Sequence, residues 1–139
     1  MSNRKMMHAY RNADREAAIE AEDPHALVAV MYDELLKSMD IFSKNLHRNQ
    51  ADLDLRGRHL SRSLTIIYAL QSSLNFEEGG EIANNLFRLY EYARQQLLAS
   101  SKSEDDTGLT SAIASLVDIR DAWTMARSPK HASKQMEAT

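Results

Sequence analysis

The 139-residue chain contains no cysteine, two prolines and four glycines. The lack of cysteine excludes disulfides, thiolate metal sites and cysteine nucleophiles, and it is consistent with a reducing compartment, so the cytoplasm is the expected location. So few prolines and glycines leave too few turns for an all-β sandwich, and 43% hydrophobic residues distinguish the chain from a disordered one. Its length fits one ordinary domain.

Long apolar runs and an excess of positive charge are also missing. No window approaches the roughly 20 apolar residues of a membrane span, and the charged N-terminal stretch lacks the apolar core of a signal peptide. The formal net charge is −3, and the chain offers few aromatic residues for base stacking. We therefore expect a soluble protein that neither inserts into membranes nor binds nucleic acid.

Four segments with helical spacing of apolar residues predict the fold. Asp23-Pro24 marks a helix start, because aspartate can cap a first turn and proline fits its first position. This helix is predicted to run to about residue 47, and three more are predicted at about 55–74, 81–100 and 109–127. The run 75–80, with its two adjacent glycines, is predicted as a helix stop and turn.

Segments of this length joined by short links favour an antiparallel four-helix bundle, so we predict an all-α fold. The bundle is expected to occupy residues 23–127. Residues 1–22 are predicted to form an N-terminal arm or short helix, because they hold few sizeable apolar groups of their own. Residues 128–139 are expected to form a mobile tail, since Ser128-Pro129 disfavours a further helical turn.

Five histidines prompt a search for metal and proton-transfer sites. A di-iron bundle needs Glu-x-x-His on two helices, but only Glu22 and His25 have this spacing, and they straddle the predicted helix start. We therefore expect no metal or other cofactor, and we interpret His25 as an exposed first-turn residue. The segment 59–63, His-Leu-Ser-Arg-Ser, resembles the His-x-x-(Lys/Arg)-(Gly/Ser) motif of histidine phosphotransfer domains. Phosphotransfer through His59 is therefore an alternative function, in which the nearby arginine would bind the phosphoryl group.

The first three predicted helices carry more apolar side chains than one core stripe needs. Grooves that accept amphipathic partner helices explain such an excess, although a broad core or self-association explains it equally well from periodicity alone. The candidates for contacts in a partner-binding groove are Tyr32, Leu36, Leu55, Ile66, Tyr68, Phe87 and Leu98.

Several motifs follow one another in a fixed order along the chain. Val30-Met31-Tyr32-Asp33 lies in the first predicted helix, and the Gly-Gly-Glu-Ile-Ala segment at 79–83 is followed by Asn-Leu and Leu-Tyr pairs. These motifs and their order resemble those of the flagellar export chaperones called FliS, in which a Leu-Tyr-Asp element corresponds to residues 31–33. The resemblance covers about residues 8–126. The positions that match family motifs are Asp33, Leu74, Gly79, Gly80, Asn85, Leu86, Leu89, Tyr90 and Trp123.

The resemblance implies a cytoplasmic helical bundle with neither enzymatic activity nor cofactor. It implies binding to the C-terminal segment of flagellin, protection from premature polymerisation, and delivery to the flagellar export gate, with other flagellar regulators as further candidate partners. Ala9-Tyr10 matches an N-terminal element of the family, so Met7 and Tyr10 are predicted to plug the groove when the client is missing, with capping of the bundle end by Tyr10 as the alternative. A purely helix-packing role stays open for Tyr32, Asn85, Leu89 and Tyr90.

Overall fold

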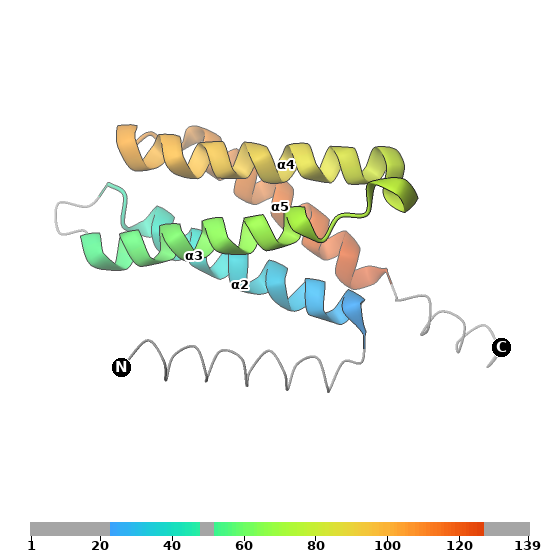
Figure 1. Ribbon diagram of the computed structural model, residues 1–139. Coiled ribbons are helices and arrows are strands. Elements are labelled where there is room, and N and C mark those ends of the chain that lie inside the picture. Colours follow the sequence, from blue (N-terminus) through green and yellow to red (C-terminus); the bar gives the residue numbers. More distant parts are fainter. Residues whose placement is uncertain (1–22, 48–51, 127–139) are drawn as a thin grey trace.

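The computed structural model describes residues 23–47 and 52–126, and the regular structure in these ranges is entirely helical. The helices are α2 (Pro24–Lys44), α3 (Leu53–Ser72), α4 (Phe76–Ser103) and α5 (Thr107–Met125). Consecutive helices run in opposite directions (Figure 1). The predicted all-α fold with four packed helices is thus confirmed.

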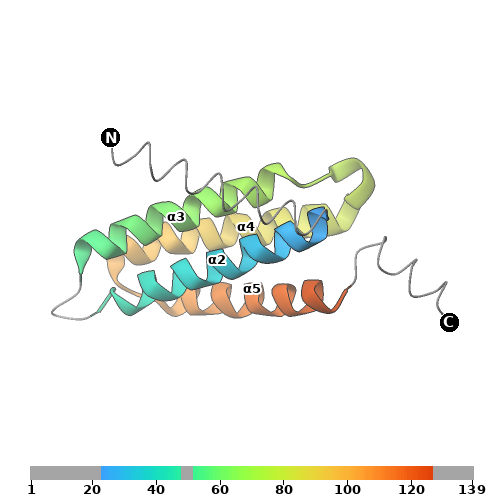
Figure 2. The ribbon, with the colours of Figure 1, turned by 90° about the horizontal axis from the view of Figure 1, so that it is seen from below.

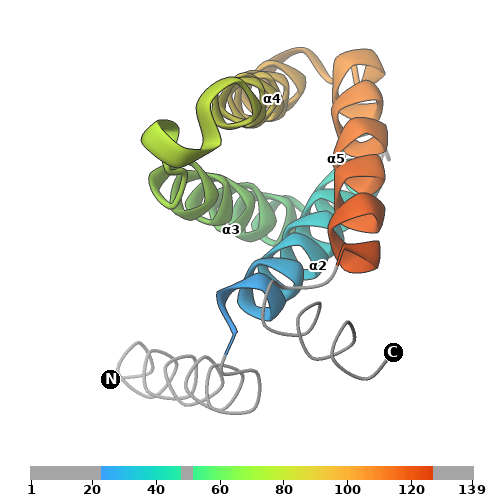
Figure 3. The ribbon, with the colours of Figure 1, turned by 90° about the vertical axis from the view of Figure 1, so that its right-hand side faces the viewer.

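The four helices surround a common core in the order α3, α2, α5, α4 (Figure 3). Helix α2 packs against both α3 and α5, and Figure 2 shows it between them. Helix α4 packs against α3 and α5, which leaves α2 and α4 on opposite corners of the bundle. Among the helices of the described ranges, none combines the length and hydropathy needed to cross a membrane.

Side-chain caps fix three of the four helix starts. Asp23, Asp52 and Asn75 each accept a hydrogen bond from a backbone N–H of the following turn, at 2.9, 2.9 and 3.1 Å. Each bond satisfies one of the N–H groups that a first helical turn leaves without a partner, and such a cap typically contributes about 1 kcal/mol. The start predicted from Asp23-Pro24 is confirmed.

The predicted turn at 75–80 is wrong, because most of this segment is the first turn of α4. Asn75 caps that turn, and the acidic Glu77 and Glu78 favour the positive end of a helix dipole. Only Gly80 leaves the helical conformation, with φ of 49° and ψ of −120°. Helix α4 therefore begins five residues before the predicted position and is kinked at Gly80.

The core lies along the inner faces of all four helices. It includes Tyr32 and Ile66, which the sequence pattern assigned to the apolar excess and not to the core stripe. Burying one large apolar side chain typically contributes about 1.5–3 kcal/mol. The buried hydrophobic residues are Tyr32, Leu35, Met39, Phe42, Leu46, Ile66, Ile67, Leu70, Ala83, Tyr90, Ala93, Leu97, Leu109, Ala112 and Leu116.

Candidate functional site

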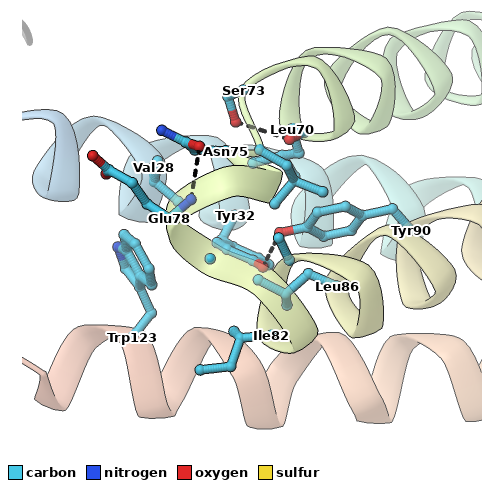
Figure 4. A pocket seen from close by; sticks show the side chains of 13 residues that line it. Val28, Tyr32, Leu70, Ser73, Asn75, Glu78, Ile82, Leu86, Tyr90 and Trp123 are labelled. Carbon is cyan, nitrogen blue, oxygen red and sulfur yellow. Dashed lines mark hydrogen bonds between the residues drawn. The ribbon is translucent and has the colours of Figure 1, made fainter.

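A cavity of about 360 Å³ lies at the end of the bundle where α2 and α4 begin and α3 and α5 end (Figure 4). All four helices contribute to its lining, which is mostly apolar. A concave apolar surface with a few polar groups is typical of a binding site. The lining residues are Val28, Tyr32, Leu70, Ser73, Leu74, Asn75, Glu78, Gly79, Ile82, Ala83, Leu86, Tyr90 and Trp123.

Two buried tyrosines form the deepest polar part of this cavity. The hydroxyl of Tyr32 on α2 is hydrogen-bonded to the hydroxyl of Tyr90 on α4, and the residues are only 1% and 2% exposed. Burial, reinforced by this bond, raises the pKa of Tyr32 well above its ordinary value. Burial also raises the pKa of Tyr90. Both hydroxyls therefore stay protonated and act as neutral hydrogen-bonding groups.

A reciprocal contact between His25 and Trp123 fixes one wall of the cavity. The two rings stack with centroids 4.2 Å apart and planes 9° from parallel. The indole Nε1 of Trp123 donates to the carbonyl of His25, and Nε2 of His25 donates to the carbonyl of Trp123, both at 2.8 Å. These contacts fasten the start of α2 to the end of α5 and hold the indole at the cavity.

The first turn of α4 forms another wall, and its glycines explain how the backbone takes this position. A Cβ at Gly79 would lie 2.9 Å from the Cβ of Ala83, so the close approach requires glycine. At Gly80 the positive φ redirects the chain into the rest of α4. Ile82, two residues after the kink, lines the cavity and is 71% exposed.

The seven predicted groove residues differ in how far they are exposed. Tyr32 and Ile66 are buried in the core, and Tyr32 also lines the cavity. Leu36 and Leu55 are partly buried. The other three are exposed on α3 or α4, where their role in partner binding stays a prediction: Tyr68, Phe87 and Leu98. The predicted plug residues Met7 and Tyr10 lie outside the described residues.

Positions that match family motifs gather around the cavity. Five of them line it, namely Leu74, Gly79, Leu86, Tyr90 and Trp123. The remaining four have other positions: Asp33 pairs with an arginine of α5 at 3.3 Å, Gly80 kinks α4, Leu89 packs against the core and Asn85 is exposed.

One contributor to the site does not follow from the sequence. His25 was interpreted as an exposed first-turn residue, whereas it is partly buried and bonded to Trp123, 98 positions further along the chain. Nothing local to either residue indicates this pairing, because it depends on how the ends of α2 and α5 meet.

The geometry gives no support to metal or phosphotransfer chemistry. Within residues 23–47 and 52–126, no group of three or more histidine, aspartate or glutamate side chains is placed to hold a metal ion. His59 is on α3, outside the cavity lining, and its Nδ1 is 3.2 Å from the hydroxyl of Ser38 on α2. Burial lowers its pKa, and the charges of Arg62, Arg58 and Lys37 lower it further.

Comparison with known proteins confirms the resemblance seen in the motifs. Residues 6–130 match the sequence model of the family described as flagellar protein FliS. The flagellar secretion chaperone FliS of Salmonella typhimurium is 32% identical over 116 residues, which cover 83% of this chain and 84% of the relative. FliSB of Pseudomonas aeruginosa is 29% identical, covering 86% and 93%, and FliS of Vibrio cholerae is 27% identical, covering 86% and 87%. The chain belongs to the FliS family of flagellar secretion chaperones, which are not enzymes.

Proposed function

We propose that this protein acts in the cytoplasm on flagellin, binds its C-terminal segment, keeps it from polymerising prematurely and assists its delivery to the flagellar export gate. The observation that carries the proposal is the apolar cavity at the end of the bundle, around which the motif positions gather. An amphipathic helix can place its apolar residues into such a surface, as in other helix-in-groove complexes.

The contact surface extends beyond the cavity. Helix α4 presents further exposed apolar side chains at Phe87 and Leu98, and Phe87 packs edge-on against Phe76 with ring centroids 6.1 Å apart. A client segment that folds on binding loses conformational entropy, so a long interface is needed to offset this loss. The cavity and α4 together provide apolar surface of that kind.

Flagellin binding can be tested by size-exclusion chromatography with light scattering. The full chain is mixed with monomeric flagellin from the same organism, either intact or without its C-terminal segment. We expect a soluble complex with the intact protein and none with the truncated one. Equal binding to both forms would contradict recognition of the C-terminal segment. A His59→Ala variant should bind flagellin normally, whereas phosphotransfer predicts acid-labile phosphate on His59.

The place of binding can be tested with two matched charge insertions. Ile82 at the cavity and Leu53 at the start of α3 are 71% and 66% exposed, so aspartate should affect the fold similarly at both positions. We expect Ile82→Asp to weaken flagellin binding at least about tenfold, because a desolvated carboxylate is costly, and Leu53→Asp to change it less than about twofold. Similar losses for both variants would argue against the cavity.

A further inference from the structure

The Tyr32–Tyr90 pair has more hydrogen-bonding capacity than the bundle uses. Each hydroxyl carries one hydrogen and can accept through two lone pairs. One hydrogen lies between the two oxygens, and within the described residues neither hydroxyl bonds any other group. One hydroxyl hydrogen is therefore left over on side chains that are 1% and 2% exposed. Leaving a buried donor without an acceptor is unfavourable.

The cavity is the space that this hydrogen can reach. Helices α2 and α4 lie on opposite corners of the bundle, so the two hydroxyls meet in its interior rather than at a helix interface. Both tyrosines line the cavity, and Figure 4 shows their hydroxyls beside the side chain of Leu86. A group that enters the cavity from outside can therefore approach the pair.

The other polar lining groups are either bonded within the protein or exposed. The hydroxyl of Ser73 donates to the carbonyl of Leu70 at 2.8 Å. The side-chain oxygen of Asn75 caps α4, and the indole N–H of Trp123 donates to a backbone carbonyl. Glu78 is exposed. Among the lining residues, the tyrosine pair is thus the buried polar group with capacity to spare.

We propose that the Tyr32–Tyr90 pair selects a client side chain with an apolar body and a neutral oxygen at its tip, either a hydroxyl or a carboxamide. This inference rests on the proposed function, since the side chain would come from the amphipathic segment of flagellin. A client side chain with an aliphatic tip would leave the spare hydroxyl hydrogen of the tyrosine pair without an acceptor. A carboxylate is desolvated near Glu78, and a cation meets no buried counter-charge. A polar site of this kind discriminates strongly against a group that cannot bond to it.

The pair can be tested by isothermal titration of the full chain with intact monomeric flagellin. The test variant is Tyr32→Phe/Tyr90→Phe, because either single substitution leaves one hydroxyl hydrogen available. Tyr92→Phe is the matched control, because Tyr92 is 38% exposed and does not line the cavity. We expect the double variant to bind about three- to tenfold more weakly, as for the loss of one hydrogen bond, and the control to bind normally.

A second set of titrations separates recognition from a merely structural role. Serine, threonine, asparagine and glutamine residues in the C-terminal segment of flagellin are replaced one at a time by apolar residues of similar size. We expect one replacement to weaken binding to the wild-type chain and to remove the difference in affinity between the wild type and the double tyrosine variant. A merely structural role of the tyrosine would leave that difference unchanged for every flagellin variant.

Two results would overturn the inference and leave the proposed function standing: full affinity of the double tyrosine variant, or no flagellin position that couples to the pair. A wild-type chain that fails to bind intact flagellin would overturn both. The flagellin replacements are also measured against the wild-type chain, so the comparison does not depend on how stable the tyrosine variants are.

Discussion

Replacement by alanine is expected to have opposite effects on the free energy of unfolding at Gly80, where α4 is kinked, and at Gly57. Gly80 has φ of 49° and ψ of −120°, a region that residues with a Cβ rarely adopt. No atom lies within 4 Å of a Cβ built at this position, so the cost of Gly80→Ala comes from the backbone and not from a clash. We expect Gly80→Ala to lower the free energy of unfolding by about 1–3 kcal/mol.

Gly57 provides the matched control. It lies inside α3, and a Cβ there also meets no atom within 4 Å. In this helical position alanine restricts the unfolded chain more than glycine does, without strain in the folded state. We expect Gly57→Ala to raise the free energy of unfolding by about 0.5–1 kcal/mol.

Urea unfolding monitored by far-ultraviolet circular dichroism measures both changes under the same conditions. The two variants should differ by about 1.5–4 kcal/mol in the free energy of unfolding, well above the error of such measurements. If Gly80→Ala were as stabilising as Gly57→Ala, α4 would continue as a regular helix through position 80, and the account of the cavity wall given above would be refuted.

Three further substitutions test other features of the protein. His25→Ala removes the stack and one hydrogen bond to Trp123, so it should lower the free energy of unfolding by about 1–2 kcal/mol in urea; an unchanged value would show that the contact does not stabilise the fold. Because the pKa of His59 is lowered from 6.5 on folding, the unfolded chain binds more protons, and stability should fall as the pH drops below about 6.5. His59→Gln should flatten this fall in urea titrations at several pH values, and an unchanged slope would assign it to other groups. Tyr10→Ala should strengthen flagellin binding in calorimetry if Tyr10 competes with the client for the groove, whereas weaker binding would contradict the plug.

Apolar spacing and capping residues predicted most of the fold, because both act within a few residues of the chain. The start of α2 follows from Asp23-Pro24 alone. The error at the start of α4 has a physical cause: two adjacent glycines favour a turn, but the cap at Asn75 and a single non-helical residue at Gly80 allow a helical turn before the kink. Local propensity does not indicate which of these effects dominates.

The site could be predicted only in part, because its contacts join distant positions. Tyr32 and Tyr90 are 58 positions apart, and His25 and Trp123 are 98 apart. Three of these residues belong to motifs that mark the family, but a motif does not show which side chains meet. The exposed position of Ile82 likewise depends on the path of α4 after its kink.

The residues that stabilise the bundle and the residues that line the cavity lie at different places along its length. Away from the cavity, large side chains such as Phe42, Leu97 and Leu109 are completely buried, and this part supplies most of the apolar burial. At the cavity, small residues at Gly79 and Ala83 leave space between the helices. Side chains around such a space make fewer packing contacts, so this end of the bundle contributes less to stability. Because the His25–Trp123 and Tyr32–Tyr90 bonds hold the surrounding helix ends in place, the cavity can stay open to a client without loosening the rest of the fold.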